Sequence, residues 1–210
     1  MRIAVACFLF LFSAFAPART IMVLGDSLSA AHRMPIDDGW VSLLQTKLSD
    51  RGCETRVVNA SISGETTLGG LNRLPKLLET HHPTMVMLEL GGNDGLRGFP
   101  IAKIKANLAE IIVRSRQAGA EVLLLGIEIP TNYGRRYAQG FAGVYPELAA
   151  EQSVKLLPFL LDGVAQYPQL MQADGVHPTA AAQPSILSNV LPLLAPRLDD
   201  CELSVNMGEQ

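Results

Sequence analysis

Residues 20 to 29 read TIMVLGDSLS, an apolar run that stops at Gly25 and continues into small polar residues. A short apolar run with this ending predicts a buried β-strand followed by a loop. Three similar runs follow along the chain, with a weaker fifth candidate after them. These expected strands are ETRVVNA at 54–60, MVMLEL at 85–90, EVLLLGI at 121–127 and LLPF at 156–159.

Helical spacing fills the gaps between the expected strands, because apolar residues recur there mostly every three or four positions. The helical segments are marked by Trp40, Leu44 and Leu48; by Leu71, Leu74, Leu77 and Leu78; by Ile101, Ile104, Leu108, Ile111 and Ile112; and by the stretch from Ala180 to Leu194. Strands that alternate with helices favour an α/β domain, in which helices cover both faces of a parallel sheet. Pro184 and Pro192 are expected to bend or split the last helix.

The first eighteen residues differ from the rest of the chain. Arg2 precedes an apolar run from Ile3 to Phe15, and Ala16-Pro17-Ala18 supplies small residues for cleavage after Ala18. This pattern is typical of a secretory signal peptide at 1–18, and the run is short for a membrane span. We therefore expect a periplasmic or secreted protein without stable membrane insertion. The alternative is a membrane anchor that is retained.

Length and composition exclude several classes of function. A chain of 210 residues fits one ordinary domain, expected at 19–198, with a polar tail at 199–210. With 48% apolar and 18% charged residues, it is too apolar for a disordered protein. The net charge of −3 argues against a nucleic-acid partner. We expect a monomer that acts on a small molecule.

Two cysteines remain after removal of a signal peptide, Cys53 and Cys201. An oxidising compartment permits a disulfide between them, and the expected topology brings both to the edge of the sheet opposite the loops considered below. Two unpaired thiols are the alternative. Neither cysteine has a metal-ligand neighbour in the sequence, and adjacent His81 and His82 point apart, so no metal site is expected. His32 is near the Ser27 loop in sequence and could contact substrate, although a surface role is the default expectation.

Four short segments carry the chemistry of the chain. They are Gly25–Ser29, Asn59–Gly64 and Gly91–Gly95, each directly after an expected strand, and Asp174–Pro178, before the last helix. The carboxyl ends of parallel strands meet at one edge of a sheet, where α/β proteins bind their ligands. We therefore expect these segments to converge.

The residue types in these segments are those that acyl transfer requires. Ser27 is the candidate nucleophile and His177 the base that activates it, with Asp174 three positions away to orient the imidazole. Gly64 offers an unhindered backbone N–H and Asn93 a side-chain amide, and these donors, with the N–H of Ser27, suit an oxyanion. Each residue alone has a simpler structural interpretation, such as a helix cap or a turn. Their combination in order predicts a serine hydrolase.

The four segments resemble the sequence blocks of the GDSL, or SGNH, hydrolase superfamily, whose Ser, Gly, Asn and His fall on Ser27, Gly64, Asn93 and His177. The strings NASISGET, LELGGNDGLRGF, NYGRRY and DGVHP resemble its bacterial periplasmic thioesterase I/protease I/lysophospholipase and arylesterase group. The resemblance extends from about Thr20 to about Leu194.

The resemblance implies a three-layer α/β/α sandwich with a flavodoxin-like parallel sheet of five strands in the order 2-1-3-4-5. It implies hydrolysis of acyl esters and thioesters through an acyl-enzyme, without a cofactor. It also implies that Asp174, rather than Asp26, is the triad acid.

Two other functions stay open. A carbohydrate acetyl-esterase on the same scaffold would carry the same triad, and a non-catalytic relative would bind an acyl ligand without cleaving it. The ordinary α/β-hydrolase fold is excluded because it requires a G-x-S-x-G motif, and the stretch Gly25–Ser29 ends in serine instead of the second glycine. Nothing in the sequence indicates which ester or thioester is the native substrate.

Overall fold

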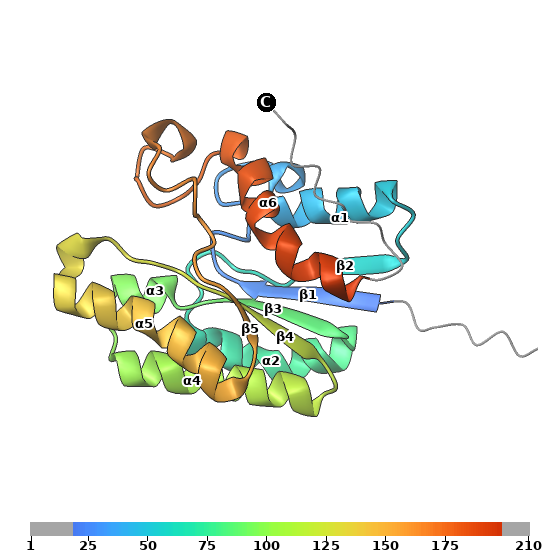
Figure 1. Ribbon diagram of the computed structural model, residues 1–210, viewed down its shortest axis with the longest axis horizontal. Helices are drawn as coiled ribbons and strands as arrows, with labels where there is room; N and C mark the ends of the chain where they lie inside the picture. The colour runs from blue at the N-terminus through green and yellow to red at the C-terminus, as the bar shows by residue number, and fades with distance from the viewer. Residues whose placement is uncertain (1–18, 199–210) are drawn as a thin grey trace, which may run out of the picture.

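The computed structural model describes residues 19–198, which are built around a parallel sheet in the order β2-β1-β3-β4-β5 (Figure 1). The expected fold class and strand order are thereby confirmed. The strands are β1 (Arg19–Gly25), β2 (Thr55–Asn59), β3 (Met85–Glu89), β4 (Glu121–Leu125) and β5 (Lys155–Leu157).

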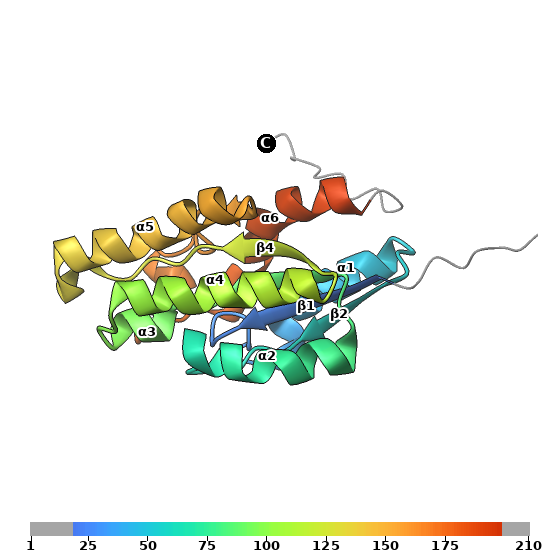
Figure 2. The ribbon, with the colours of Figure 1, turned by 90° about the horizontal axis from the view of Figure 1, so that it is seen from below.

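Helices cover both faces of this sheet, as Figures 1 and 2 show. One layer holds α1 (Trp40–Asp50) and α6 (Gln183–Leu194), and the other holds α2 (Thr67–His81), α4 (Ile101–Gln117) and α5 (Arg135–Gln152). A five-residue helix, α3 (Gly92–Leu96), follows β3 directly. Single 3-10 turns lie at Ile36–Asp38, Thr131–Tyr133, Pro168–Leu170, Ala180–Ala182 and Ala195–Arg197.

The side chains of β1 divide between two apolar cores. Ile21 and Val23 pack in the core beneath α1 and α6, whereas Met22 and Leu24 pack in the core of α2, α4 and α5. All four are at most 1% exposed. A strand buried on both faces reads as a continuous apolar run rather than an alternating one, which explains why the sequence signal at 20–24 is so clear.

Four of the expected strands end one or two residues earlier in the structure, and the expected last helix is divided. The fifth strand ends at Leu157 rather than Phe159, because Pro158 has no N–H to continue the ladder. The expected helix at 180–194 is divided into a 3-10 turn and α6, with Pro184 in the first turn of α6 and Pro192 inside it. Proline is tolerated in a first turn because the N–H there has no partner within the helix.

Several predictions fall on residues outside the described range, namely the signal peptide at 1–18 and the tail at 199–210. Cys53 is half-buried and disulfide-bonded. Its predicted partner, Cys201, lies in the tail, so the pairing of these two cysteines stays a prediction. Within residues 19–198, no helix has the length and apolar character needed to cross a membrane.

Candidate active site

Ser27 lies in the turn that follows β1, at the carboxyl edge of the sheet. The turn forms because the N–H groups of Ser29 and Ala30 both donate to the carbonyl of Asp26, over 3.3 and 3.0 Å. The carboxylate of Asp26 also accepts the N–H of Leu28 over 3.1 Å. Ser27 is therefore fixed on a tight turn, with its side chain half-buried.

His177 contacts both Ser27 and Asp174. Its Nε2 lies 2.9 Å from the Oγ of Ser27, and its Nδ1 lies 2.9 Å from the Oδ2 of Asp174. The tautomer with its proton on Nδ1 satisfies both contacts, because Nδ1–H then donates to Asp174 and Nε2 accepts from the hydroxyl. The geometry is that of a nucleophile, a base and an orienting carboxylate.

The carboxylate of Asp174 is held by the backbone of its own loop. Its Oδ1 accepts the N–H groups of His177 and Val176, each over 3.0 Å. These two hydrogen bonds, followed by the one from the His177 side chain, hold the pKa of Asp174 well below its usual range. Asp174 is therefore ionised at neutral pH and suited to stabilise a protonated imidazole.

Gln172 fastens the loop of Asp174 and His177 to the rest of the site. Its N–H donates to the carbonyl of His177 over 2.7 Å. Its side-chain amide donates to the carbonyls of Pro178 and His32, over 3.0 and 2.9 Å. Nothing in the sequence pattern pointed to Gln172, because its partners are backbone carbonyls that only the fold brings near.

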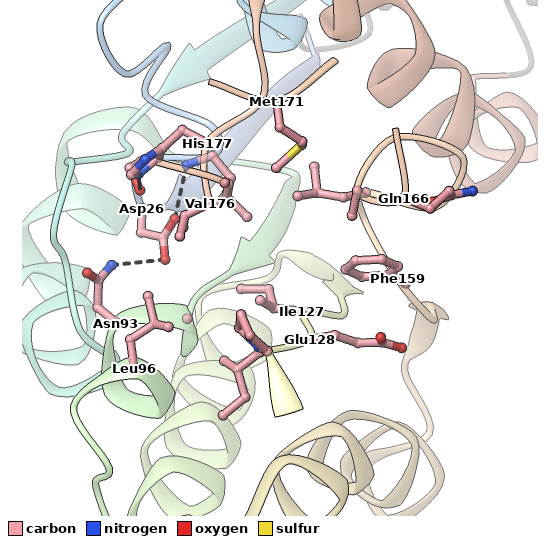
Figure 3. A pocket seen from close by; sticks show the side chains of 18 residues that line it. Asp26, Asn93, Leu96, Ile127, Glu128, Phe159, Gln166, Met171, Val176 and His177 are labelled. Atoms are coloured by element: carbon pink, nitrogen blue, oxygen red, sulfur yellow. Dashed lines mark hydrogen bonds between the residues drawn. The ribbon is translucent and has the colours of Figure 1, made fainter. Parts of the chain in front are cut away.

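Asn93 lies in the first turn of α3, where its side-chain amide donates to the Oδ2 of Asp26 over 3.1 Å (Figure 3). Gly64 lies in the loop after β2, and its backbone has a φ of 82°, which favours glycine. Its carbonyl accepts a hydrogen bond from Arg97 at the end of α3, over 3.2 Å. This contact holds the Gly64 loop against the helix that carries Asn93.

A buried carboxyl pair underlies the Ser27 turn. The Oε2 of Glu89, the last residue of β3, accepts the N–H of Asp26 over 3.1 Å and the hydroxyl of Ser29 over 2.7 Å. Gly25 is needed for this approach, since a Cβ there would lie 2.6 Å from the same oxygen. Glu89 was not among the residues predicted from the sequence, although a carboxylate at the end of the apolar run at 85–89 could have indicated a role at this edge of the sheet.

Burial changes the titration of both members of this pair. Desolvation raises the pKa of Asp26 to about 6, and it raises the pKa of Glu89 well above its usual range, with the charge of Asp26 adding to the effect. Both side chains are at most 2% exposed. Burial therefore favours the neutral form of both carboxyls in the folded protein.

His32 packs on the imidazole of His177, with ring centroids 4.1 Å apart and planes tilted by 31°. Its Nδ1 lies 3.3 Å from the Oγ of Ser63, next to Gly64. Burial, followed by the nearby His177, lowers the pKa of His32. The structure keeps His32 partly exposed near the Ser27 loop and, beyond the sequence expectation, packs its ring on the candidate base.

A pocket of about 790 Å³ opens beside Ser27 and His177 (Figure 3). Its apolar lining comes mainly from the loops after β4 and β5, from α3 and from the loop before Asp174. These residues include Leu96, Ile127, Ile129, Phe159, Leu161 and Met171. Among the described residues, the lining includes Ser27, Asn93 and His177, whereas Gly64 and Asp174 lie outside it.

Comparison with known proteins gives one consistent family. The model of the GDSL-like lipase/acylhydrolase family matches residues 23–183. Esterase TesA of Pseudomonas aeruginosa is 53% identical over 183 residues, covering 87% of this chain and 91% of that protein. Thioesterase 1/protease 1/lysophospholipase L1 of Escherichia coli K12 is 50% identical over 171 residues, or 81% of each chain.

A solved structure agrees with these relatives. The crystal structure of TesA superposes with a TM-score of 0.82 at 53% identity, covering 85% of this chain and 99% of the TesA chain. The shared family therefore extends across nearly the whole described domain.

The Asp26–Glu89 pair predicts how stability depends on pH. A folded-state pKa above the unfolded value means that the folded protein binds more protons, so the free energy of unfolding falls as pH rises through that interval. In Glu89→Gln one such group is removed. At pH 5 we expect chemical denaturation to give similar free energies of unfolding for the variant and the wild type. Between pH 5 and pH 8 this free energy should fall less in the variant than in the wild type.

The control is Glu110→Gln, which changes an exposed carboxylate of α4 that pairs with Arg114. Its pH profile should run parallel to that of the wild type. A parallel profile for Glu89→Gln as well would contradict the assignment of a titrating, buried Glu89.

Proposed function

The chain belongs to the GDSL-like lipase/acylhydrolase family and hydrolyses esters and thioesters, and we propose that it does so through Ser27, His177 and Asp174. The observation that carries this proposal is the position of His177, which contacts Ser27 and Asp174 over 2.9 Å each. A serine hydroxyl becomes an effective nucleophile only when a base of this kind takes its proton.

In the first step, the Oγ of Ser27 attacks the acyl carbonyl, while the Nε2 of His177 accepts the hydroxyl proton. The ionised Asp174 stabilises the imidazolium that results. His177 then protonates the leaving alcohol or thiol, and an ester to Ser27 remains. In the second step, His177 takes a proton from the water that attacks the acyl carbonyl, the bond to the Oγ of Ser27 breaks, and His177 returns the proton to Oγ as the acid is released. Each step uses side chains of this chain, the substrate and water.

The oxyanion of each tetrahedral intermediate is proposed to rest on the N–H groups of Ser27 and Gly64 and on the side chain of Asn93. A primary amide has two N–H donors. One donor of Asn93 is held by Asp26, which fixes the amide plane and leaves the second for the substrate. Gly64 is exposed, and a Cβ built there would meet nothing within 4 Å, so the residue is not crowded by neighbouring side chains.

The apolar pocket supports an acyl chain longer than acetyl as the substrate group beside Ser27. A pocket of about 790 Å³ lined by Ile127, Ile129 and Phe159 gains binding free energy from each methylene that it buries, by about 0.8 kcal/mol. An acetyl-esterase has no use for such a lining. Lysophospholipids, aryl esters and acyl-CoA thioesters all remain within this substrate class.

Export to the periplasm or secretion, with removal of residues 1–18, is part of the proposal, as is a monomeric state. Export rests on the sequence pattern of residues 1–18, and the monomeric state is an expectation from the sequence. The small-molecule character of the substrate is supported by the family.

Labelling with a serine-directed organophosphate distinguishes the enzyme from a non-catalytic, acyl-binding relative. We expect one adduct per chain, on the peptide that contains Ser27, together with complete loss of esterase activity. Mass spectrometry of the digested protein identifies the site. Ser27→Ala should abolish both labelling and activity, whereas Ser63→Ala on the neighbouring exposed loop should keep both. Labelling that persists in Ser27→Ala would refute the assignment of the nucleophile.

Asn93→Ala tests the oxyanion site. Removal of one oxyanion donor is expected to lower kcat by roughly 10²–10³ with little change in KM, because the hydrogen bond strengthens in the transition state. Steady-state kinetics on an aryl ester measures this. Asn72→Ala, on the exposed side of α2, is the matched control and should leave kcat unchanged. An unchanged kcat in Asn93→Ala would remove this residue from the proposed role.

The acyl pocket predicts a rising kcat/KM from acetyl to longer acyl groups in a series of aryl esters and acyl-CoAs. Ala165→Phe adds bulk to the lining and should reduce activity on the longer chains more than on acetyl. Ala102→Phe, exposed on α4, is the control and should leave the profile unchanged. A profile that is highest at acetyl would favour the carbohydrate acetyl-esterase alternative instead.

A further inference from the structure

We infer that His32, Asp174 and His177 form a binding site for a transition-metal ion of the zinc type, and that occupation of this site switches the hydrolase off. One ligand atom of each residue lies within 4.8 Å of the corresponding atoms of the other two. The site itself depends only on this geometry, whereas inhibition rests on the role of His177 proposed above.

The three groups match the ligand preference of Zn²⁺. This ion binds imidazole nitrogens at about 2.0–2.1 Å and carboxylate oxygens at about 2.0–2.2 Å, and three protein ligands leave its fourth position to water. Two imidazoles with a single carboxylate do not suit Mg²⁺ or Ca²⁺, which take oxygen ligands. The site therefore selects a borderline-soft ion.

The structure holds these ligands close together before any ion binds. Asp174 and His177 share a loop, and Gln172 ties that loop to the carbonyl of His32 over 2.9 Å. The residues on either side of His32, Ala31 and Arg33, have φ values of 54° and 55°. This left-handed backbone is rare for residues other than glycine. His32 thus lies between two residues of constrained backbone, and its ring packs on that of His177 with centroids 4.1 Å apart.

Closing the site around an ion requires only a small adjustment. Ligand atoms on a tetrahedral zinc are about 3.3 Å apart, which follows from the bond lengths, and those of this site lie within 4.8 Å of one another. His32 is half-exposed and Asp174 is exposed, so an ion reaches them directly from solvent. The Nδ1 of His32 contacts the hydroxyl of Ser63 over 3.3 Å, a neutral partner that an ion can replace.

Metal binding at this site is incompatible with the proposed catalysis whichever nitrogen of His177 is used. Coordination through Nε2 occupies the lone pair that accepts the proton of Ser27. Coordination through Nδ1 displaces the contact with Asp174 that orients the ring. In both cases His177 no longer serves as a base, so the ion competes with turnover rather than assisting it.

The test titrates Zn²⁺ chloride against the full-length protein in a buffer that does not bind metal. Calorimetry on Ser27→Ala measures binding without turnover, and esterase assays on the wild type measure inhibition. His32→Phe keeps an aromatic ring on His177 but removes the ligand. His81→Gln/His82→Asn removes the other two histidines of the described chain and serves as the control. Each variant's inhibition is expressed relative to its own uninhibited rate.

We expect one zinc ion per chain, inhibition that EDTA reverses, and no inhibition by Mg²⁺. His32→Phe should weaken both binding and inhibition by at least about tenfold, and the His81/His82 control should change neither. Equal zinc sensitivity in His32→Phe would overturn the site. Zinc binding that depends on His32 without inhibition would keep the site and count against His177 as the base, so the two proposals fail separately.

Discussion

The geometry of the reaction centre depends on the carboxyl group of Glu89, buried at the end of β3. Its Oε2 accepts hydrogen bonds from the Asp26 backbone and the Ser29 hydroxyl, so it ties the turn of one strand to the end of its neighbour. The carboxylate of Asp26, fixed in this way, accepts hydrogen bonds from the Asn93 amide and the N–H of Leu28 and so holds both in place. Glu89 thus positions the turn of Ser27, proposed as the nucleophile, and through Asp26 the amide of Asn93, proposed as an oxyanion donor.

Burying such a group is costly unless it is paired or neutral, and the fold meets this requirement in two ways. Two donors satisfy Oε2, whereas Oε1 has no hydrogen-bond partner among the described residues, and burial raises the pKa of Glu89, which favours the neutral carboxyl. Gly25 provides the space, because any side chain there would collide with the carboxyl. Gly25 in the first sequence block therefore serves packing, while the chemical role is proposed for Ser27, two positions further on.

Much of the fold was predictable because β1 and β3 are buried on both faces and read as continuous apolar runs. The residues proposed for the triad were found from loop position and spacing, since Asp174 and His177 are only three apart. Glu89, Gln172 and the packing of His32 were not found. Their roles arise from contacts between segments distant in sequence, and neither periodicity nor local spacing reports such contacts.

The apolar lining of the pocket has a consequence for the divergence of such enzymes. Ile127, Ile129, Phe159 and Leu161 stand on loops after β4 and β5, while Ser27 and Asn93 follow β1 and β3. Substitutions in the loops after β4 and β5, called the outer loops, can therefore change the proposed acyl selectivity. The loops after β1 and β3, which carry Ser27 and Asn93, need not change. One chain architecture thereby yields a range of substrate preferences, which makes the outer loops the natural place for directed evolution to begin.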